Sequence, residues 1–120
     1  MTIELSRKYD LSAAHHLPRA PEGHKCRTLH GHSYQIEVVV RGDVDPDTGW
    51  LMDYGDIDQH VRPLVAELDH RTLNDIPGLK NPTSEILCGW LWERLEGVLR
   101  GLQRVSVAET RSTACHYYGD

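Results

Sequence analysis

The strongest constraint on the fold is the alternation that follows two closely spaced histidines. After His30-Gly31-His32, apolar side chains recur at every second position, at Tyr34, Ile36, Val38 and Val40. This period of two predicts a strand from about His30 to Arg41 with one buried face. His30 and His32 share the parity of the apolar residues, so two imidazoles can converge on one ion. Taken alone, a His-x-His pair is more often two polar residues at the start of a strand.

Residues 3–15 alternate in the same way and predict a second strand that pairs antiparallel with the first. Arg7 interrupts the apolar set, and we therefore expect this face of the strand to be partly exposed to solvent. His15 falls on the apolar parity and is a candidate inward ligand, whereas His16 points outward. The alternative for His15 is a hydrogen-bonded core histidine.

Two helices are predicted between residues 53 and 101. Asp53 and Asp56 offer N-caps for the first helix, and Pro63 inside its apolar pattern predicts a kink or a short break. Asn81 caps the second helix, which has Pro82 at its first position and ends at Gly101. The apolar face of this second helix is expected to contain Ile86, Leu87, Trp90, Leu91, Leu95, Val98 and Leu99.

The C-terminal region predicts two further strands. Residues 103–110 alternate, and Glu109 has the parity of Val105 and Val107, where an ionised carboxylate needs a partner. The alternative is that the strand ends and Glu109 is solvated. Residues 112–115 are expected to form a turn and residues 116–118 a last short strand. The order ββααββ predicts a single α+β domain over residues 1–120, with a four-stranded antiparallel sheet and both helices on one face.

Charge and hydropathy limit the classes of function. The net charge of −5 disfavours nucleic-acid binding, which needs a basic face. No apolar run has the length of a membrane span, and the N-terminus lacks signal-peptide architecture. Three cysteines, an odd number, fit a reducing compartment. We therefore expect a cytoplasmic protein without a membrane or nucleic-acid partner.

His15, His30 and His32 together have the composition of a zinc site. Three protein ligands leave one position open, which is the catalytic arrangement, whereas Cys26 as a fourth ligand would close the site and make it structural. If Cys26 does not bind the metal, its cationic neighbours Lys25 and Arg27 favour a thiolate that acts as base or nucleophile. Asp69-His70 is a second candidate for proton transfer, or an ordinary polar pair after a helix end.

These motifs, in this order, resemble the 6-pyruvoyltetrahydropterin synthase family. Within that family the chain is similar to the branch of queuosine biosynthesis whose members form 6-carboxy-5,6,7,8-tetrahydropterin, as Glu22–Cys26 and Leu73–Leu79 indicate. The matching segments are Ala13-Ala14-His15 with Leu17, Cys26-x-x-x-His30-Gly31-His32, Leu68-Asp69-His70, Asn81-Pro82-Thr83-Ser84-Glu85 and Glu109-Thr110.

The resemblance implies a zinc-dependent lyase with a T-fold subunit that assembles as a homohexamer of two trimers, with active sites at subunit interfaces. The family's zinc ligands correspond to His15, His30 and His32. Its catalytic residues correspond to Cys26, Asp69 and His70, and its pterin anchor to Glu109, with Thr110 beside it. The implied reaction converts 7,8-dihydroneopterin triphosphate to 6-carboxy-5,6,7,8-tetrahydropterin and releases acetaldehyde and triphosphate.

Two alternatives stay open at this point. The first is a 6-pyruvoyltetrahydropterin synthase, which eliminates triphosphate without losing carbon. The second is a non-catalytic, zinc-stabilised binding module, which requires Cys26 on the metal and leaves Asp69, His70 and Glu109 without a purpose.

Overall fold

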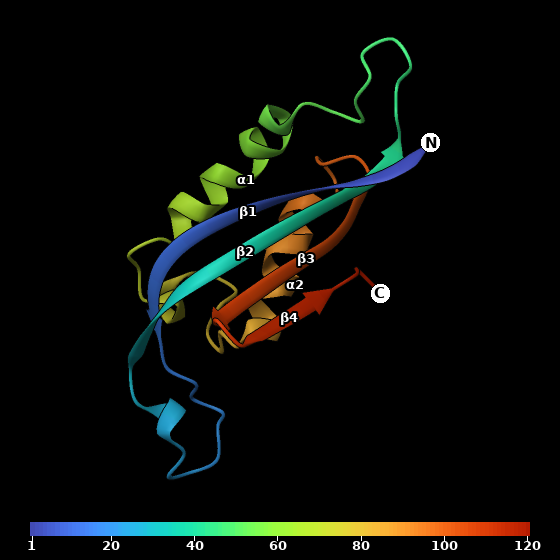
Figure 1. Ribbon diagram of the computed structural model, residues 1–120. Coiled ribbons are helices and arrows are strands. Elements are labelled where there is room, and N and C mark those ends of the chain that lie inside the picture. The colour runs from blue at the N-terminus through green and yellow to red at the C-terminus, as the bar shows by residue number, and fades with distance from the viewer.

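The computed structural model describes all 120 residues and has the predicted α+β architecture. Each strand pairs antiparallel with the next in the order β1-β2-β3-β4, and both helices cover one face of this sheet (Figure 1). The elements are β1 (Thr2–His15), β2 (His30–Asp43), α1 (Tyr54–Leu68), α2 (Ser84–Leu95), β3 (Leu102–Thr110) and β4 (Thr113–Tyr117), with single 3-10 turns at Lys25–Arg27 and Leu73–Asp75.

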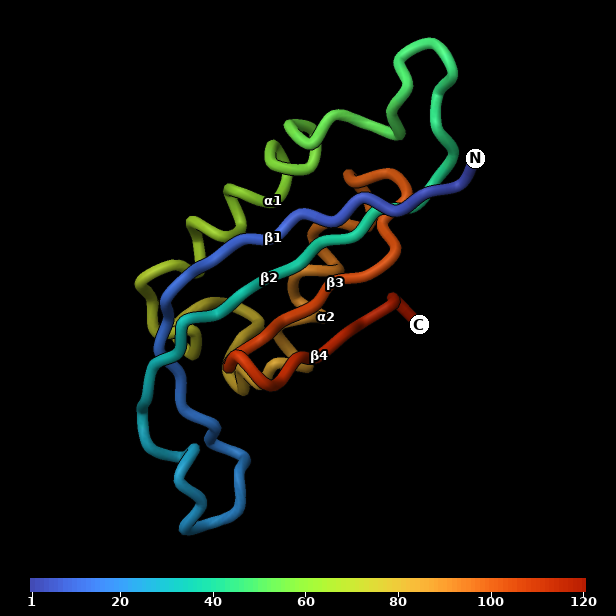
Figure 2. The backbone as a smooth tube through the Cα atoms, viewed as in Figure 1, coloured from blue at the N-terminus to red at the C-terminus, as the bar shows by residue number.

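The long β1–β2 hairpin determines the shape of the molecule. Its register runs from Thr2 opposite Asp43 to His15 opposite His30, so the two strands stay paired over their whole length. Figure 2 shows the connection between them, residues 16–29, projecting beyond the sheet at the end opposite the N-terminus. The molecule is accordingly elongated, with extents of 57 × 25 × 23 Å.

The core fills the space between the sheet and the two helices. The alternating residues predicted to face inward are buried: Tyr9 and Leu11 from β1, Ile36 and Val38 from β2, and Val107 from β3. Helix α1 packs against β1, and α2 against β3 and β4. The helical side of this core comprises Ile57, Val61, Leu68, Leu87, Cys88, Trp90, Leu91 and Leu95. Neither helix is long and apolar enough to cross a membrane.

Helix α1 differs from the expected break at Pro63. The helix is continuous from Tyr54 to Leu68, and Asp53 caps it through a hydrogen bond accepted from Gly55 N at 2.8 Å. Pro63 lies on the exposed side of the helix. There, water can bind the carbonyl of Gln59, which lacks its usual donor because proline has no N–H.

Helix α2 is shorter at both ends than its apolar pattern predicts. Its N-cap is Thr83 rather than Asn81, because the Thr83 hydroxyl accepts a hydrogen bond from Ile86 N at 3.1 Å. The helix ends at Leu95 rather than at Gly101. Ile86 and Val98, expected on the buried face, are exposed, whereas Leu99 is buried from the turn that follows the helix.

The C-terminal hairpin also differs from the prediction. The turn consists of Arg111 and Ser112, and Thr113–Tyr117 is strand, so Cys115 lies in β4 and not in a turn. Thr110 pairs with Thr113, and their hydroxyls form a hydrogen bond of 2.5 Å across this two-residue connection. Residues 103–110 are therefore followed at once by a partner strand, and Glu109 sits inside a hairpin.

Candidate metal and substrate site

Three histidines converge where the β1–β2 hairpin leaves the sheet. The register places His15 opposite His30 and Ala13 opposite His32, so one face of two strands supplies all three rings. The ring centroids are 4.6, 5.0 and 4.9 Å apart, each pair edge to face. One nitrogen from each ring lies within 4.8 Å of those of the other two. The parity argument for His15, His30 and His32 is thus matched by their geometry.

The backbone fixes the orientation and tautomer of two of these rings. His15 Nδ1 lies 2.8 Å from Pro82 O, and His30 Nδ1 lies 2.7 Å from Thr28 O. A carbonyl only accepts, so both rings donate from Nδ1 and carry a lone pair on Nε2. A hydrogen bond from Nδ1 to a backbone carbonyl is the usual way in which a protein orients a histidine whose Nε2 binds a metal.

The donor set fits a divalent transition metal. His15 Nε2 and His32 Nε2 are buried and have no hydrogen-bond partner. Burial lowers the pKa of His15, which keeps that imidazole neutral as metal binding requires. Buried polar atoms without partners are rare, and two of them facing a third imidazole are explained by an ion that accepts their lone pairs. Imidazole nitrogens suit zinc, and three of them leave a further position for substrate.

Glu109 points into the same place. Its Oε1 lies 4.0 Å from His15 Nε2 and its Oε2 lies 3.9 Å from His32 Nε2, with a quarter of the side chain exposed. Because β4 continues the sheet beyond Glu109, the carboxylate is held over the histidine cluster. The geometry therefore differs from that of a solvated strand end.

Cys26 lies outside this convergent group. The three histidines alone make up the set of ligand atoms within 4.8 Å of one another. Cys26 sits half-buried in the 3-10 turn of the projecting connection, where its N–H donates to His24 Nδ1 and its carbonyl accepts from Leu17 N. Its sulfur makes no hydrogen bond. The structure therefore does not include the Cys26 sulfur in the converging set of ligand atoms.

Asp69 and His70 contact each other at the outer edge of β1. His70 Nδ1 lies 3.0 Å from Asp69 Oδ1, and Asp69 also accepts from Ser12 N at 2.9 Å. The Ser12 N–H holds the pKa of Asp69 below its usual range, and His70 adds to this. The His70 side chain is 81% exposed, and its backbone has φ of 59°, a left-handed conformation that costs roughly 1–2 kcal/mol in a residue with a Cβ.

His70 and the histidine cluster share a hollow but no bond. A cavity of about 520 Å³ is lined by Ser12, Gly31, His32, His70 and Thr72. No hydrogen bond or ion pair joins the Asp69–His70 pair to Cys26 or to the cluster. Within one chain, His70 therefore has a strained backbone and an exposed imidazole that lies near the histidine cluster without a bond to it.

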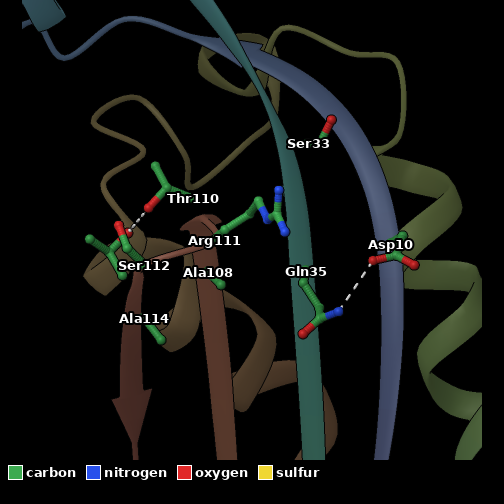
Figure 3. Close-up of a pocket in the computed structure, with 9 residues that line it drawn as sticks. Asp10, Ser33, Gln35, Ala108, Thr110, Arg111, Ser112 and Ala114 are labelled. Carbon is green, nitrogen blue, oxygen red and sulfur yellow. Dashed lines mark hydrogen bonds between the residues drawn. The ribbon is translucent and has the colours of Figure 1, made fainter.

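Thr110 points away from Glu109 and towards a different hollow. Figure 3 shows this hollow, of about 610 Å³, on the sheet face that carries no helices. Arg111 extends across it from the β3–β4 turn, and Gln35 Nε2 donates to Asp10 Oδ1 at 3.4 Å on its far side (Figure 3). None of the three clustered histidines lines it, so it is separate from the candidate metal site.

Two residues to which the sequence analysis gave no role in the site lie beside it. Glu85, in the first turn of α2, lines a cavity of about 420 Å³ together with Glu109 and Cys115. Tyr34 packs its ring edge-on against His15 and His32, with centroid distances of 5.9 and 5.4 Å. Tyr34 follows His32 on the same face, which could have identified it, whereas nothing local in the sequence brings Glu85 to Glu109.

Three imidazoles from the β1–β2 hairpin and a carboxylate from β3 thus meet at one end of the sheet, in an arrangement that could hold a metal ion. The sequence profile of "6-pyruvoyl tetrahydropterin synthase" matches residues 4–120. The chain belongs to the 6-pyruvoyl tetrahydropterin synthase family.

Relatives with named activities extend this comparison. The chain is 42% identical to a 6-carboxy-5,6,7,8-tetrahydropterin synthase of Synechocystis sp. over 93% of its length and 90% of the relative. It is 33% identical to the human 6-pyruvoyl tetrahydrobiopterin synthase over 76% of its length and 67% of the relative. The structure of the Caenorhabditis elegans 6-pyruvoyl tetrahydropterin synthase superposes over the whole chain and 97% of its own, with a TM-score of 0.91 at 28% identity. The fold is thus the T-fold of this family.

Proposed function

We propose that this chain is a zinc-dependent carbon–carbon lyase of queuosine biosynthesis. It converts 7,8-dihydroneopterin triphosphate to 6-carboxy-5,6,7,8-tetrahydropterin and releases acetaldehyde and triphosphate. The observation that carries the proposal is the convergence of His15, His30 and His32, with two unpaired Nε2 atoms beside the Glu109 carboxylate. The Synechocystis relative, 42% identical and named for this product, supports the choice of reaction.

His15, His30 and His32 are the ligands in this proposal. Pro82 O and Thr28 O hold two of the rings with their Nε2 lone pairs turned to the common point. A bound zinc ion would supply Lewis-acid polarisation of the vicinal hydroxyls on the substrate side chain. Lining residues such as the fully buried Tyr34 limit water on the inner side of the cluster.

Glu109 anchors the pterin ring. A carboxylate accepts two hydrogen bonds at once, which matches the ring N–H and exocyclic amino group along one edge of a pterin. The 420 Å³ cavity beside Glu109 offers room for that edge, and its second carboxylate, Glu85, suits a ligand rich in donors. Thr110 has its side chain on the other face of the sheet, so a contribution from it to binding would come from its backbone.

Cys26, Asp69 and His70 move protons. The Cys26 thiolate removes a proton beside the pterin ring, and His70, oriented by its contact with Asp69, returns or relays one. Asp69 is ionised because Ser12 N–H and His70 lower its pKa, so it can stabilise a charged His70. The exposure of His70 allows it to reach substrate held mainly by a neighbouring chain.

A homohexamer of two trimers is the assembly we propose. The two outer strands of the sheet, β1 and β4, leave their outer edges open apart from Ser12 and Ala14 of β1, which meet residues 69–72. Open edges of this kind pair with further strands. The three free cysteines fit a reducing compartment, and we assign the enzyme to the cytoplasm.

Product analysis tests the proposal. The zinc-loaded chain is incubated with 7,8-dihydroneopterin triphosphate, and pterins, acetaldehyde and triphosphate are quantified. Equal amounts of 6-carboxy-5,6,7,8-tetrahydropterin, acetaldehyde and triphosphate support the proposal. Triphosphate with a 6-pyruvoyl pterin and no acetaldehyde would assign the alternative activity, for which the human relative is named. Zinc binding without turnover would indicate the non-catalytic, zinc-stabilised binding module.

A further inference from the structure

Tyr34 is a buried tyrosine whose hydroxyl has no hydrogen-bond partner. Only 1% of the residue is exposed. An unpaired buried hydroxyl lowers stability, and a phenylalanine of the same shape would avoid this cost. The hydroxyl therefore needs an explanation outside the folding of the ligand-free chain.

Tyr34 lies beside two of the histidines and, on the same face of the sheet, next to Glu109. Its ring lies edge-on to His15 and His32, and the register that pairs Gln35 with Ala108 and Ile36 with Val107 puts Tyr34 beside Glu109. Its hydroxyl can donate or accept a hydrogen bond, and it has no partner in this structure.

Glu109 lacks a donor within the histidine cluster. Its nearest cluster atoms are His15 Nε2 and His32 Nε2, at 4.0 and 3.9 Å. The proton of His15 is on Nδ1, where it binds Pro82 O, so its Nε2 presents a lone pair to the carboxylate. A metal on these nitrogens would likewise leave them without a proton to donate. The Tyr34 O–H, on the adjacent strand, is a buried donor that is still free.

We propose that Tyr34 is a positioning residue, whose hydroxyl donates a hydrogen bond to the Glu109 carboxylate when a pterin occupies the site. The inference rests on the proposed role of Glu109 as pterin anchor. A carboxylate offers about four acceptor positions, so it can bind the Tyr34 hydroxyl and two donors of the pterin edge together. Because the bond forms only with the ligand in place, its free energy adds to binding, and it holds the Glu109 carboxylate against the pterin edge.

The test compares Tyr34→Phe with Tyr54→Phe, which removes the same atom from an exposed tyrosine on α1 that makes no hydrogen bond. The ligand-free melting temperature, the zinc content and the affinity of the zinc-loaded hexamer or other native assembly for 7,8-dihydroneopterin are measured for both. Tyr34→Phe should keep its zinc, and its ligand-free melting temperature should be equal or higher, because the deleted hydroxyl is buried without a partner there. Its affinity for 7,8-dihydroneopterin should fall roughly 10- to 100-fold, the effect of a hydrogen bond to a charged group.

A double-mutant cycle with Glu109→Gln separates positioning from packing. If Tyr34 acts through the carboxylate, Tyr34→Phe should have little effect in the Glu109→Gln background, whereas an independent packing effect would add. Additive losses, or equal affinities for Tyr34→Phe and Tyr54→Phe, would overturn the role of Tyr34 alone. A lower ligand-free melting temperature in Tyr34→Phe would also overturn it. An unaltered chain that fails to bind 7,8-dihydroneopterin would overturn the proposed function, and this inference with it.

Discussion

Replacing Cys26 with alanine tests whether this residue has a catalytic role or a structural one. The change removes one sulfur atom from a half-buried side chain in the 3-10 turn Lys25–Arg27. That sulfur makes no hydrogen bond, and the contacts that hold the turn use the backbone of Cys26: its N–H to His24 and its carbonyl to Leu17. Both contacts survive in the alanine variant.

The expected magnitudes follow from this geometry. A substitution without cavity, buried charge or lost hydrogen bond changes the free energy of unfolding by at most about 0.5 kcal/mol. In a chain of 120 residues this shifts the melting temperature by no more than about 3 °C. Zinc content should stay at its original value, since three histidines remain. Turnover should fall by roughly two to four orders of magnitude, the usual range for a positioned acid–base group.

The assay measures zinc stoichiometry, melting temperature and acetaldehyde release on one preparation. His30→Ala is the matched control, because it removes a member of the convergent set and should lose zinc and activity together. Loss of zinc in Cys26→Ala, in step with activity, would make Cys26 a ligand and refute the reasoning. Full activity with full zinc would assign proton removal to another group, with His70 the first to examine.

Three further outcomes are expected. Glu109→Gln should keep zinc but weaken pterin binding about 10-fold or more, by titration calorimetry, because it replaces a charged double acceptor with one acceptor and one donor; an unchanged affinity would make Glu109 a solvated residue. Sedimentation at micromolar concentration should show no monomer, and an active monomer would contradict the interface site. Asp58, whose pKa is lowered by hydrogen bonds from Tyr9 and Arg7, stabilises the fold above about pH 4, and this is lost as pH falls through its lower folded pKa. Asp58→Asn should therefore flatten the acid loss of melting temperature between pH 5 and 2, and an unchanged slope would refute the link.

The alternation of side chains was sufficient to predict the sheet and the shared face of the three histidines. His15, His30 and His32 share the parity of their buried neighbours, and strand geometry converts a shared parity into a shared face. The same argument placed Glu109 with Val105 and Val107, although it left open whether the carboxylate was solvated. The structure answers that point through contacts, because the Glu109 carboxylate is only a quarter exposed and lies 4.0 Å from His15 and 3.9 Å from His32.

The ends of α2 and one contact between distant elements were not predicted correctly. The N-cap of α2 is Thr83 and not the predicted Asn81, because the Thr83 hydroxyl accepts a hydrogen bond from the helix. The helix also ends six residues before the predicted Gly101. An apolar pattern cannot distinguish a last helical turn from a buried turn that follows it, as Leu99 illustrates. The approach of Glu85 to Glu109 likewise depends on how α2 packs against β3, which local spacing does not encode.

The central claim is that three histidines of one hairpin form the metal centre on which lyase activity depends. Titrating zinc into metal-free protein while acetaldehyde release is measured tests it directly. Activity should rise linearly and reach a plateau at one zinc per chain, and His15→Ala should show neither tight binding nor activity. Acetaldehyde release from metal-free protein at the rate of the zinc-loaded form would contradict the claim, as would full activity of His15→Ala at one zinc per chain.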